Sequence, residues 1–289
     1  MFSPEIVIAA VINGLLTGAV YALVSVALTL VYGVLHIINF AHGAILTAAM
    51  FAAFFAQQAG VDPLIAVVFI APAFFLLGYA MQRWIIGPAS HGDDRNILLV
   101  TLGLSIVIEN ALLAAFRSDT RSIDVPYGFS SVDLGFVFLP MPRVIAFGVT
   151  CAVALLLWAL LTRTDAGKAI RAVAREKLGA ALVGIDVPHV YALTFGIGAA
   201  CLAVAACVLL PSYYVHPRVG NAYVLIAFTV VVLGGMGSVP GAMIGGLFIG
   251  VVESLSGLYF GESLGQLGVF VIFILVLLVR PTGLFGARA

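Results

Sequence analysis

Long apolar stretches dominate this chain and limit what it can fold into. A helix rises about 1.5 Å per residue and the hydrocarbon core of a bilayer is about 30 Å thick, so a spanning helix needs about 20 mainly apolar residues. Of the 289 residues, 63% are hydrophobic and 9% are charged, whereas a soluble domain carries about 25% charged residues. The sequence therefore predicts an all-α, polytopic membrane protein with one transmembrane domain over residues 1–289. The expected spans are 5–34, 43–59, 63–86, 96–116, 142–162, 189–210, 221–235, 240–260 and 265–280.

The count of spans is open at eight or nine. Stretches 221–235 and 240–260 are short and interrupted by glycines. Backbone that is not helical is tolerated at membrane depth only where protein shields it from lipid. This pair can therefore form two crossings, or one crossing plus a re-entrant element.

Basic residues predict the orientation, because Lys and Arg favour the cytoplasmic side in short loops. Segment 163–177 holds the densest basic cluster. Placing it in the cytoplasm puts nine of the 13 Lys and Arg residues on that side. We then expect an extracytoplasmic N-terminus, a cytoplasmic C-terminus and one long outward loop near 117–141, which forms a small cap or docking surface. The four basic residues left outside are Arg117, Arg121, Arg143 and Arg218.

Two histidines, an asparagine and a glycine interrupt the apolar run between the first two expected spans. Polar side chains and freed backbone groups are costly in hydrocarbon unless they are buried in protein or line a wet cavity. One interpretation is a helix break at the translocation path or gate. The other is a plain polar turn at the membrane surface. The candidate residues are His36, Asn39, His42 and Gly43.

A glycine-rich segment near the end of the chain is the second candidate. Gly234, Gly235 and Gly237 precede a stripe of small residues that includes Gly246 and Gly250, and Glu253 lies on the same helix face as that stripe. Small residues let helices approach closely, so Glu253 should point from a packing surface and not toward lipid. Tight packing around a hydrogen-bonded acid and a role in the path or gate both fit this pattern.

Glu109 is a third candidate for the path. It shares a stripe with Thr101 and Ser105 at four-residue spacing, and an acid inside a span normally faces the bundle interior. No partner base can be identified in the sequence. A structural hydrogen bond and a transport role are equally compatible with this position.

The basic loop 163–188 predicts one short amphipathic helix. Thr164 or Asp165 is a good N-cap, Gly184 is a good residue for the C-terminal turn, and Pro188 stops any continuation. A helix with one basic face and one face of small residues suits docking to a protein partner. The alternative is a juxtamembrane helix that binds anionic lipid. Lys168, Arg171 and Arg175 form the basic face.

Several functions are disfavoured by what the sequence lacks. Lys+Arg and Asp+Glu both number 13, so no net basic charge points to nucleic acid. The pattern G-x-x-x-x-G-K-[ST] is absent, so a P-loop ATPase site is not expected in this chain. The three cysteines lie in apolar runs and predict no metal site. A membrane enzyme would need a nucleophile with its base or a metal set, and neither pattern is visible.

Several motifs in order resemble the H-type permease subunit of branched-chain amino acid ABC importers, over nearly the whole length. They are NGLLTGAVYAL from Asn13, VYGVLHIINFAHG from Val31, RAVAREKLGAALVGID from Arg171, GGMGSVPGA from Gly234 and LVRPTGLFG from Leu278.

The resemblance implies a multi-pass subunit of a bacterial inner-membrane importer. Its expected partners are a second permease chain in a heterodimer, two cytoplasmic ATPases, a periplasmic or extracellular substrate-binding protein, and membrane lipid. This chain would bind no cofactor of its own, since ATP and Mg²⁺ belong to the ATPase subunits. A cytoplasmic loop helix would couple to the ATPase, although Lys177-Leu178-Gly179 separates Glu176 from the alanines of the family pattern. The coupling candidates are Lys168, Arg171, Arg175, Glu176, Ala180, Ala181 and Gly184.

The expected substrates are leucine, isoleucine and valine, while similar permeases serve urea, short amides or aromatic acids. The function of another class that stays open is a secondary transporter or channel. Such a protein more often shows paired charges inside the membrane. Only Glu109 and Glu253 qualify here.

Overall fold

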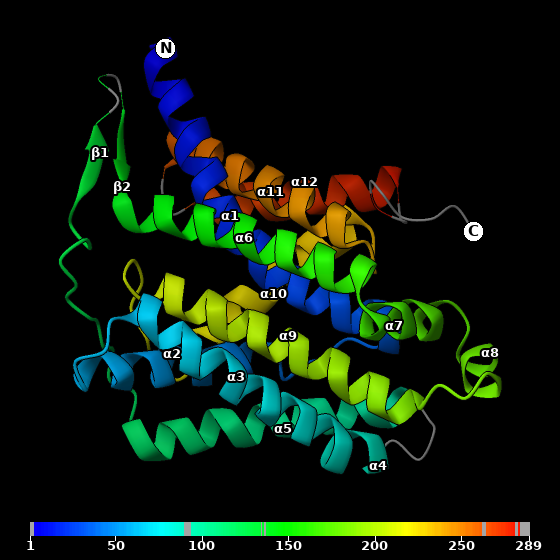
Figure 1. The fold of residues 1–289 in the computed structure, drawn as a ribbon. Helices are drawn as coiled ribbons and strands as arrows, with labels where there is room; N and C mark the ends of the chain where they lie inside the picture. The colour runs from blue at the N-terminus through cyan, green and yellow to red at the C-terminus, as the bar shows by residue number, and fades with distance from the viewer. Residues whose placement is uncertain are drawn as a thin grey trace.

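The computed structural model describes residues 3–89, 94–133, 135, 137–261, 264–280 and 283, with the backbone alone for residues 94 and 95. Helices make up nearly all of it (Figure 1). The elements are α1 (Pro4–Leu35), α2 (His42–Gln58), α3 (Pro63–Met81), the π-helix η1 (Gln82–Ile86), α4 (Gly87–Ala89), α5 (Asp94–Phe116), β1 (Ser131–Asp133), β2 (Phe138–Pro140), α6 (Met141–Arg163), α7 (Asp165–Arg175), α8 (Lys177–Leu182), α9 (Val187–Leu209), α10 (Gly220–Gly234), α11 (Val239–Phe260) and α12 (Gly265–Val279).

The helical pattern confirms the polytopic membrane fold. Each of the nine predicted spans falls on a helix, and the stretch 63–86 continues from α3 through η1. Within the described residues, six helical stretches are long and apolar enough to cross a membrane, while α10 and α12 are shorter apolar helices of 15 residues. α10 and α11 are separate helices that contact each other on either side of a short turn.

The loop between α5 and α6 contains a short β-hairpin, which the all-α prediction missed. β1 and β2 are antiparallel, with Val132 opposite Leu139. Leu139 packs with Leu16 of α1, so the hairpin lies beside the N-terminal part of that helix. Figure 1 shows the hairpin and the start of α1 at one end of the bundle, with α7 and α8 at the other.

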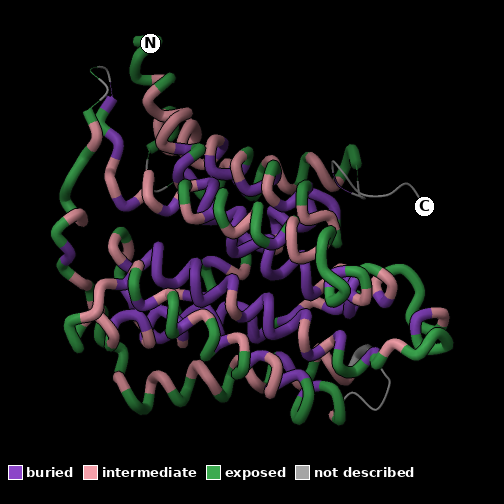
Figure 2. Tube along the Cα trace, in the orientation of Figure 1, coloured by how far each residue is buried: buried purple, intermediate pink, exposed green. Residues whose placement is uncertain are grey.

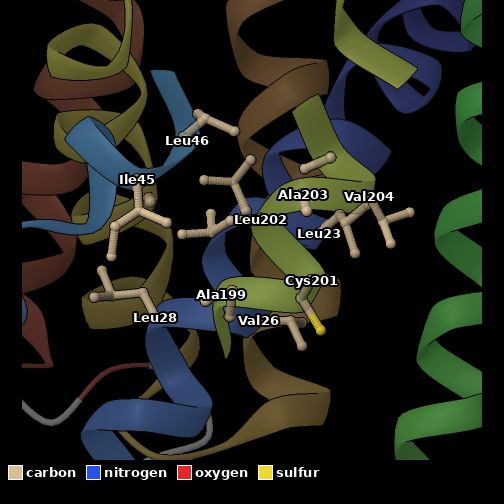
Figure 3. Packing of buried hydrophobic residues seen from close by; sticks show 14 of the residues in the cluster. Leu23, Val26, Leu28, Ile45, Leu46, Ala199, Cys201, Leu202, Ala203 and Val204 are labelled. Carbon is tan, nitrogen blue, oxygen red and sulfur yellow. The ribbon is translucent and has the colours of Figure 1, made fainter. Parts of the chain in front are cut away.

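The core is built around α9, which contacts α1, α2 and α3 along the bundle. Most of α9 is buried, whereas few residues of α5 are (Figure 2). Figure 3 shows Leu202 of α9 between Ile45 of α2 and Leu23 of α1, and all three side chains are almost fully buried. Burying such a side chain contributes about 1.5–3 kcal/mol relative to water, although lipid weakens this term between membrane helices.

α1 and α11 meet along a seam of glycines. A Cβ on Gly14 would lie 2.7 Å from Val251 Cα, and one on Gly18 would lie 2.8 Å from Leu247 Cα. On the facing helix, a Cβ on Gly246 would lie 2.5 Å from Ala22 Cα. This close approach confirms the prediction that the small-residue stripe of α11 is a packing surface.

Candidate translocation and coupling site

A cavity of about 630 Å³ lies between α1, α10, α11 and the start of α12. It sits in the half of the bundle that carries the β-hairpin, because its walls include the first half of α1 and the last turns of α11. Such a volume is within the range of small-molecule sites, about 300–1,000 Å³. The polar side chains that line it include Asn13, Tyr21, Arg143, Tyr213, Tyr223 and Glu253.

Glu253 reaches this cavity because of its place on α11. Gly250, one turn earlier, is pressed against Gly14 and Gly18 of α1, so the same face carries the carboxyl to the edge of the seam. The hydroxyl of Tyr21 lies near the Glu253 carboxyl. Oε2 of Glu253 is buried and has no hydrogen-bond partner among the described residues. The sequence thus identified Glu253 correctly as an interior acid.

Three tyrosines and one arginine surround the acid. The rings of Tyr21 and Tyr223 are 6.4 Å apart, and those of Tyr213 and Tyr223 are 6.3 Å apart, both edge to face. Burial raises the pKa of Tyr213 in the loop before α10, and the positive charge of Arg143 opposes that rise. Sequence analysis did not single out Arg143, although its expected place on the side with fewer basic residues was a usable signal.

The break between α1 and α2 lies inside the bundle. α1 ends at Leu35, and His36 adopts a left-handed conformation (φ 56°) at an exposed position. His42 is buried, with Nε2 3.1 Å from the carbonyl oxygen of Val24. Asn39 is also buried, and its Oδ1 accepts a hydrogen bond from the backbone N–H of Ala41 (3.0 Å). A polar turn at the membrane surface therefore describes only the His36 end of the segment.

The two breaks do not line the 630 Å³ cavity. Gly43 packs against Gly220 at the start of α10. Gly234 closes on Gly241 across the α10–α11 turn, where Gly235 and Gly237 have φ of 94° and 84°. These positive φ angles explain why glycine occupies the turn. Asn39 lines a much smaller cavity of about 10 Å³ together with Gln82 and Thr101.

Glu109 turns toward the rest of the bundle at its edge, as its stripe with Thr101 predicted: its side chain is 20% exposed and Thr101 is buried. α5 lies at the edge of the bundle, and its opposite face, with Ile106 and Val107, is exposed. Oε1 of Glu109 lies 2.7 Å from Nε of Arg218. The partner base comes from the segment before α10, which spacing within α5 could not reveal.

The loop 163–188 forms two helices rather than the single helix predicted. Thr164 caps α7 as expected, with Oγ1 accepting from the backbone N–H of Gly167 (3.0 Å). Glu176 is extended (φ −153°, ψ 100°) and caps α8 by accepting from the N–H of Leu178 (3.2 Å). Gly184 has φ 89° and follows the end of α8 as predicted. The break between α7 and α8 occurs at Glu176 because its carboxylate can cap the start of a new helix.

The predicted coupling residues divide between exposed and buried positions. Lys168, Arg171, Arg175, Glu176, Ala181 and Gly184 are exposed, while Ala180 is buried. Lys168 pairs with Asp165 at 2.8 Å, beside the start of α7.

An apolar patch on and just after α8 was missed by sequence analysis. Its members are Leu178, Leu182 and Val183, which are 74%, 88% and 78% exposed. A six-residue helix is too short to show a clear apolar period. Large contiguous apolar groups on a surface mark interaction sites. Their position beside Arg171 and Arg175 makes this end of the molecule the candidate docking surface.

Comparison with known proteins supplies the family. The family described as "Branched-chain amino acid transport system / permease component" matches residues 10–280. The chain belongs to this family. It is therefore a multi-pass membrane permease, a transport component of an ABC importer.

Two curated relatives of this permease component cover almost the whole chain. The permease protein BraD of the high-affinity branched-chain amino acid transport system of Pseudomonas aeruginosa is 35% identical, over 95% of this chain and 94% of its own. The corresponding permease protein LivH of Salmonella typhimurium is 36% identical with the same coverage. Among solved structures, PsaBC from Streptococcus pneumoniae in complex with Fab matches 93% of this chain and 91% of its own, with a TM-score of 0.52 and 17% identity. That likeness supports the fold alone.

Proposed function

We propose that this chain forms, with a second permease subunit, the translocation path of an importer for branched-chain amino acids. Separate ATPase subunits supply the energy and hold ATP and Mg²⁺, and a substrate-binding protein delivers the amino acid. The observation that carries the proposal is the arrangement of the bundle. A polar cavity lies toward one end, and an exposed apolar patch beside basic residues lies at the other.

The end that carries α7 and α8 is cytoplasmic in this proposal. Five basic residues lie in segment 163–177, and basic residues favour the cytoplasmic side. The start of α1 and the hairpin then face the outside, where a binding protein docks. The cavity beside Glu253 is the outer part of the path.

Contact with an ATPase subunit is the role we assign to α7 and α8. Leu178, Leu182 and Val183 provide apolar area for the contact, and Arg171 and Arg175 provide charge for orientation. Ala180 is excluded from this surface because it packs inward. An apolar patch at the end of a membrane bundle needs a covering partner, and an ATPase subunit in the cytoplasm is one that an importer requires.

The test is a double substitution, Leu182→Ser with Val183→Ser, in the assembled complex. Each apolar side chain removed from a contact costs about 1–2 kcal/mol, so co-purification of the ATPase subunits should fall at least about tenfold. Phe129→Ser is the matched control, because Phe129 is also highly exposed but lies in the loop at the opposite end. The proposal fails if the double variant keeps its ATPase subunits and its leucine uptake.

A further inference from the structure

Two opposite charges line the 630 Å³ cavity without touching each other. Glu253 comes from α11 and Arg143 from the first turn of α6. Neither takes part in an ion pair within 4.0 Å in the part of the chain that the structure describes. Arg143 is nevertheless close enough for its positive charge to act on the Glu253 carboxyl.

We propose that Glu253 and Arg143 together bind the ammonium and carboxylate groups of one zwitterionic α-amino acid. This inference rests on the proposed function, in which the cavity is the outer part of the path. The ammonium pairs with the Glu253 carboxylate, which lines the cavity and has no ion-pair partner among the described residues. The carboxylate accepts from the guanidinium of Arg143, whose planar N–H groups suit a carboxylate.

Because Glu253 and Arg143 do not pair with each other, they favour a ligand that carries both a positive and a negative charge. A cation alone would satisfy Glu253 and leave Arg143 unpaired, and an anion alone would do the reverse. Both charged residues are partly buried, so leaving one of them unpaired is unfavourable. A molecule that carries both charges on neighbouring atoms satisfies both residues at once. Urea and short amides carry neither charge, and aromatic acids carry only one.

One part of the wall fits an uncharged aliphatic side chain. Val219, Ala222 and Ile226 line the cavity from the start of α10, and Ala10 and Leu258 line it from α1 and α11. Gly257 and Gly265 add no side-chain bulk. A branched aliphatic group can therefore lie against apolar carbon while its charged end faces Glu253 and Arg143.

The experiment measures protection of a reporter cysteine in the full complex in nanodiscs. Ala222→Cys places a thiol on the cavity wall at an exposed position. Cys151 is replaced by Ser because it is exposed, whereas Cys201 and Cys207 are buried. The rate of modification by a charged thiol reagent is compared with L-leucine, with L-leucinamide, which lacks the carboxylate, and with 4-methylpentanoate, which lacks the ammonium.

We expect saturating L-leucine to slow modification about tenfold, as expected for a site that is about nine-tenths occupied. The two analogues should have little effect. Glu253→Gln and Arg143→Gln should each abolish protection, while Glu5→Gln, an acid in the exposed first turn of α1, should keep it. Because the analogue comparison uses unchanged Glu253 and Arg143, misfolding of a variant cannot hide the answer.

Equal protection by leucine and both analogues would overturn the zwitterion site, and so would absence of protection. The proposed path is tested separately on the same reporter, with the full complex in sealed proteoliposomes so that uptake can be measured. If modification at position 222 blocks ATP-driven leucine uptake while leucine gives no protection, the path stands and the binding site falls. If modification leaves uptake unchanged, the cavity is not in the path.

Discussion

Glu109 and Arg218 form an ion pair, with 2.7 Å between Oε1 and Nε, that ties α5 to the segment before α10. α5 lies at the edge of the bundle and few of its residues are buried, so it packs less closely against the other helices than α9 does. The Arg218 side chain is 66% exposed and that of Glu109 is 20% exposed. The pair thus works as a link at the rim of the bundle.

Removing this link should weaken the attachment of α5. We expect Glu109→Gln to lower the free energy of unfolding by about 0.5–1 kcal/mol, the range for partly exposed ion pairs. The exchange Glu109→Arg with Arg218→Glu should restore most of that loss. Thermal unfolding of the detergent-solubilised protein measures both, and an exchange variant no better than Glu109→Arg alone would contradict the pairing.

The glycine seam predicts a large effect of side-chain size. Gly250→Leu would drive side-chain atoms into the backbone of α1 at Gly14 and Gly18, and overpacking of this kind costs about 1–3 kcal/mol or more. Gly103→Leu in α5 is the control, because a Cβ at Gly103 would meet no described neighbour within 4 Å. Gel filtration and thermal unfolding should show loss of the monodisperse protein for Gly250→Leu only. Equal behaviour of the two variants would show that α1 and α11 do not pack this closely.

Two buried threonine hydroxyls predict opposite changes in stability when each threonine is replaced by valine. Oγ1 of Thr29 is buried without a hydrogen-bond partner among the described residues. Thr29→Val keeps the shape and removes that hydroxyl, so it should raise stability by about 1 kcal/mol. Thr47→Val should lower it by a similar amount, because Oγ1 of Thr47 donates to Gly43 O (2.9 Å) and accepts from Gly220 N–H (3.0 Å). If the melting temperatures of the two variants shift in the same direction, the different hydrogen bonding of the Thr29 and Thr47 hydroxyls is refuted.

The orientation of the chain can be tested with two single cysteines. Gly128→Cys lies in the loop with the hairpin, and Arg175→Cys lies at the end of α7. A membrane-impermeant thiol reagent added to intact cells lacking an outer barrier should modify position 128 and leave position 175 unmodified. Inverted vesicles should give the reverse. Modification of both positions from one side would mean that the chain crosses the membrane an even number of times between them.

Sequence analysis found the features that depend only on residues close together in the sequence. Apolar length predicted the spans, and the four-residue spacing of Gly246 and Gly250 predicted that the same face of α11 would carry Glu253 inward. Thr164 and Gly184 marked helix ends because capping depends on neighbouring residues. Each of these signals is local.

The features that sequence analysis missed depend on contacts between distant elements. Glu109 meets Arg218 and Glu253 shares a cavity with Arg143 only after several helices have packed. The residue spacing within α5 or α11 cannot predict that either arginine lies nearby. Three of the four basic residues expected on the outer side have structural partners or line the cavity, since Arg121 also stacks over Phe54 and Phe116.

The glycine seam also bears on how the gene can change over time. Every single substitution at Gly14, Gly18, Gly246 or Gly250 adds a Cβ, and the backbone opposite is too close to accept one. A second substitution across the seam cannot compensate, because glycine is already the smallest residue and the obstruction is main chain. We therefore expect these four codons to be nearly fixed among functional relatives, while codons for the outward residues of α5 drift. Relatives of this protein should therefore differ mainly at positions outside the glycine seam.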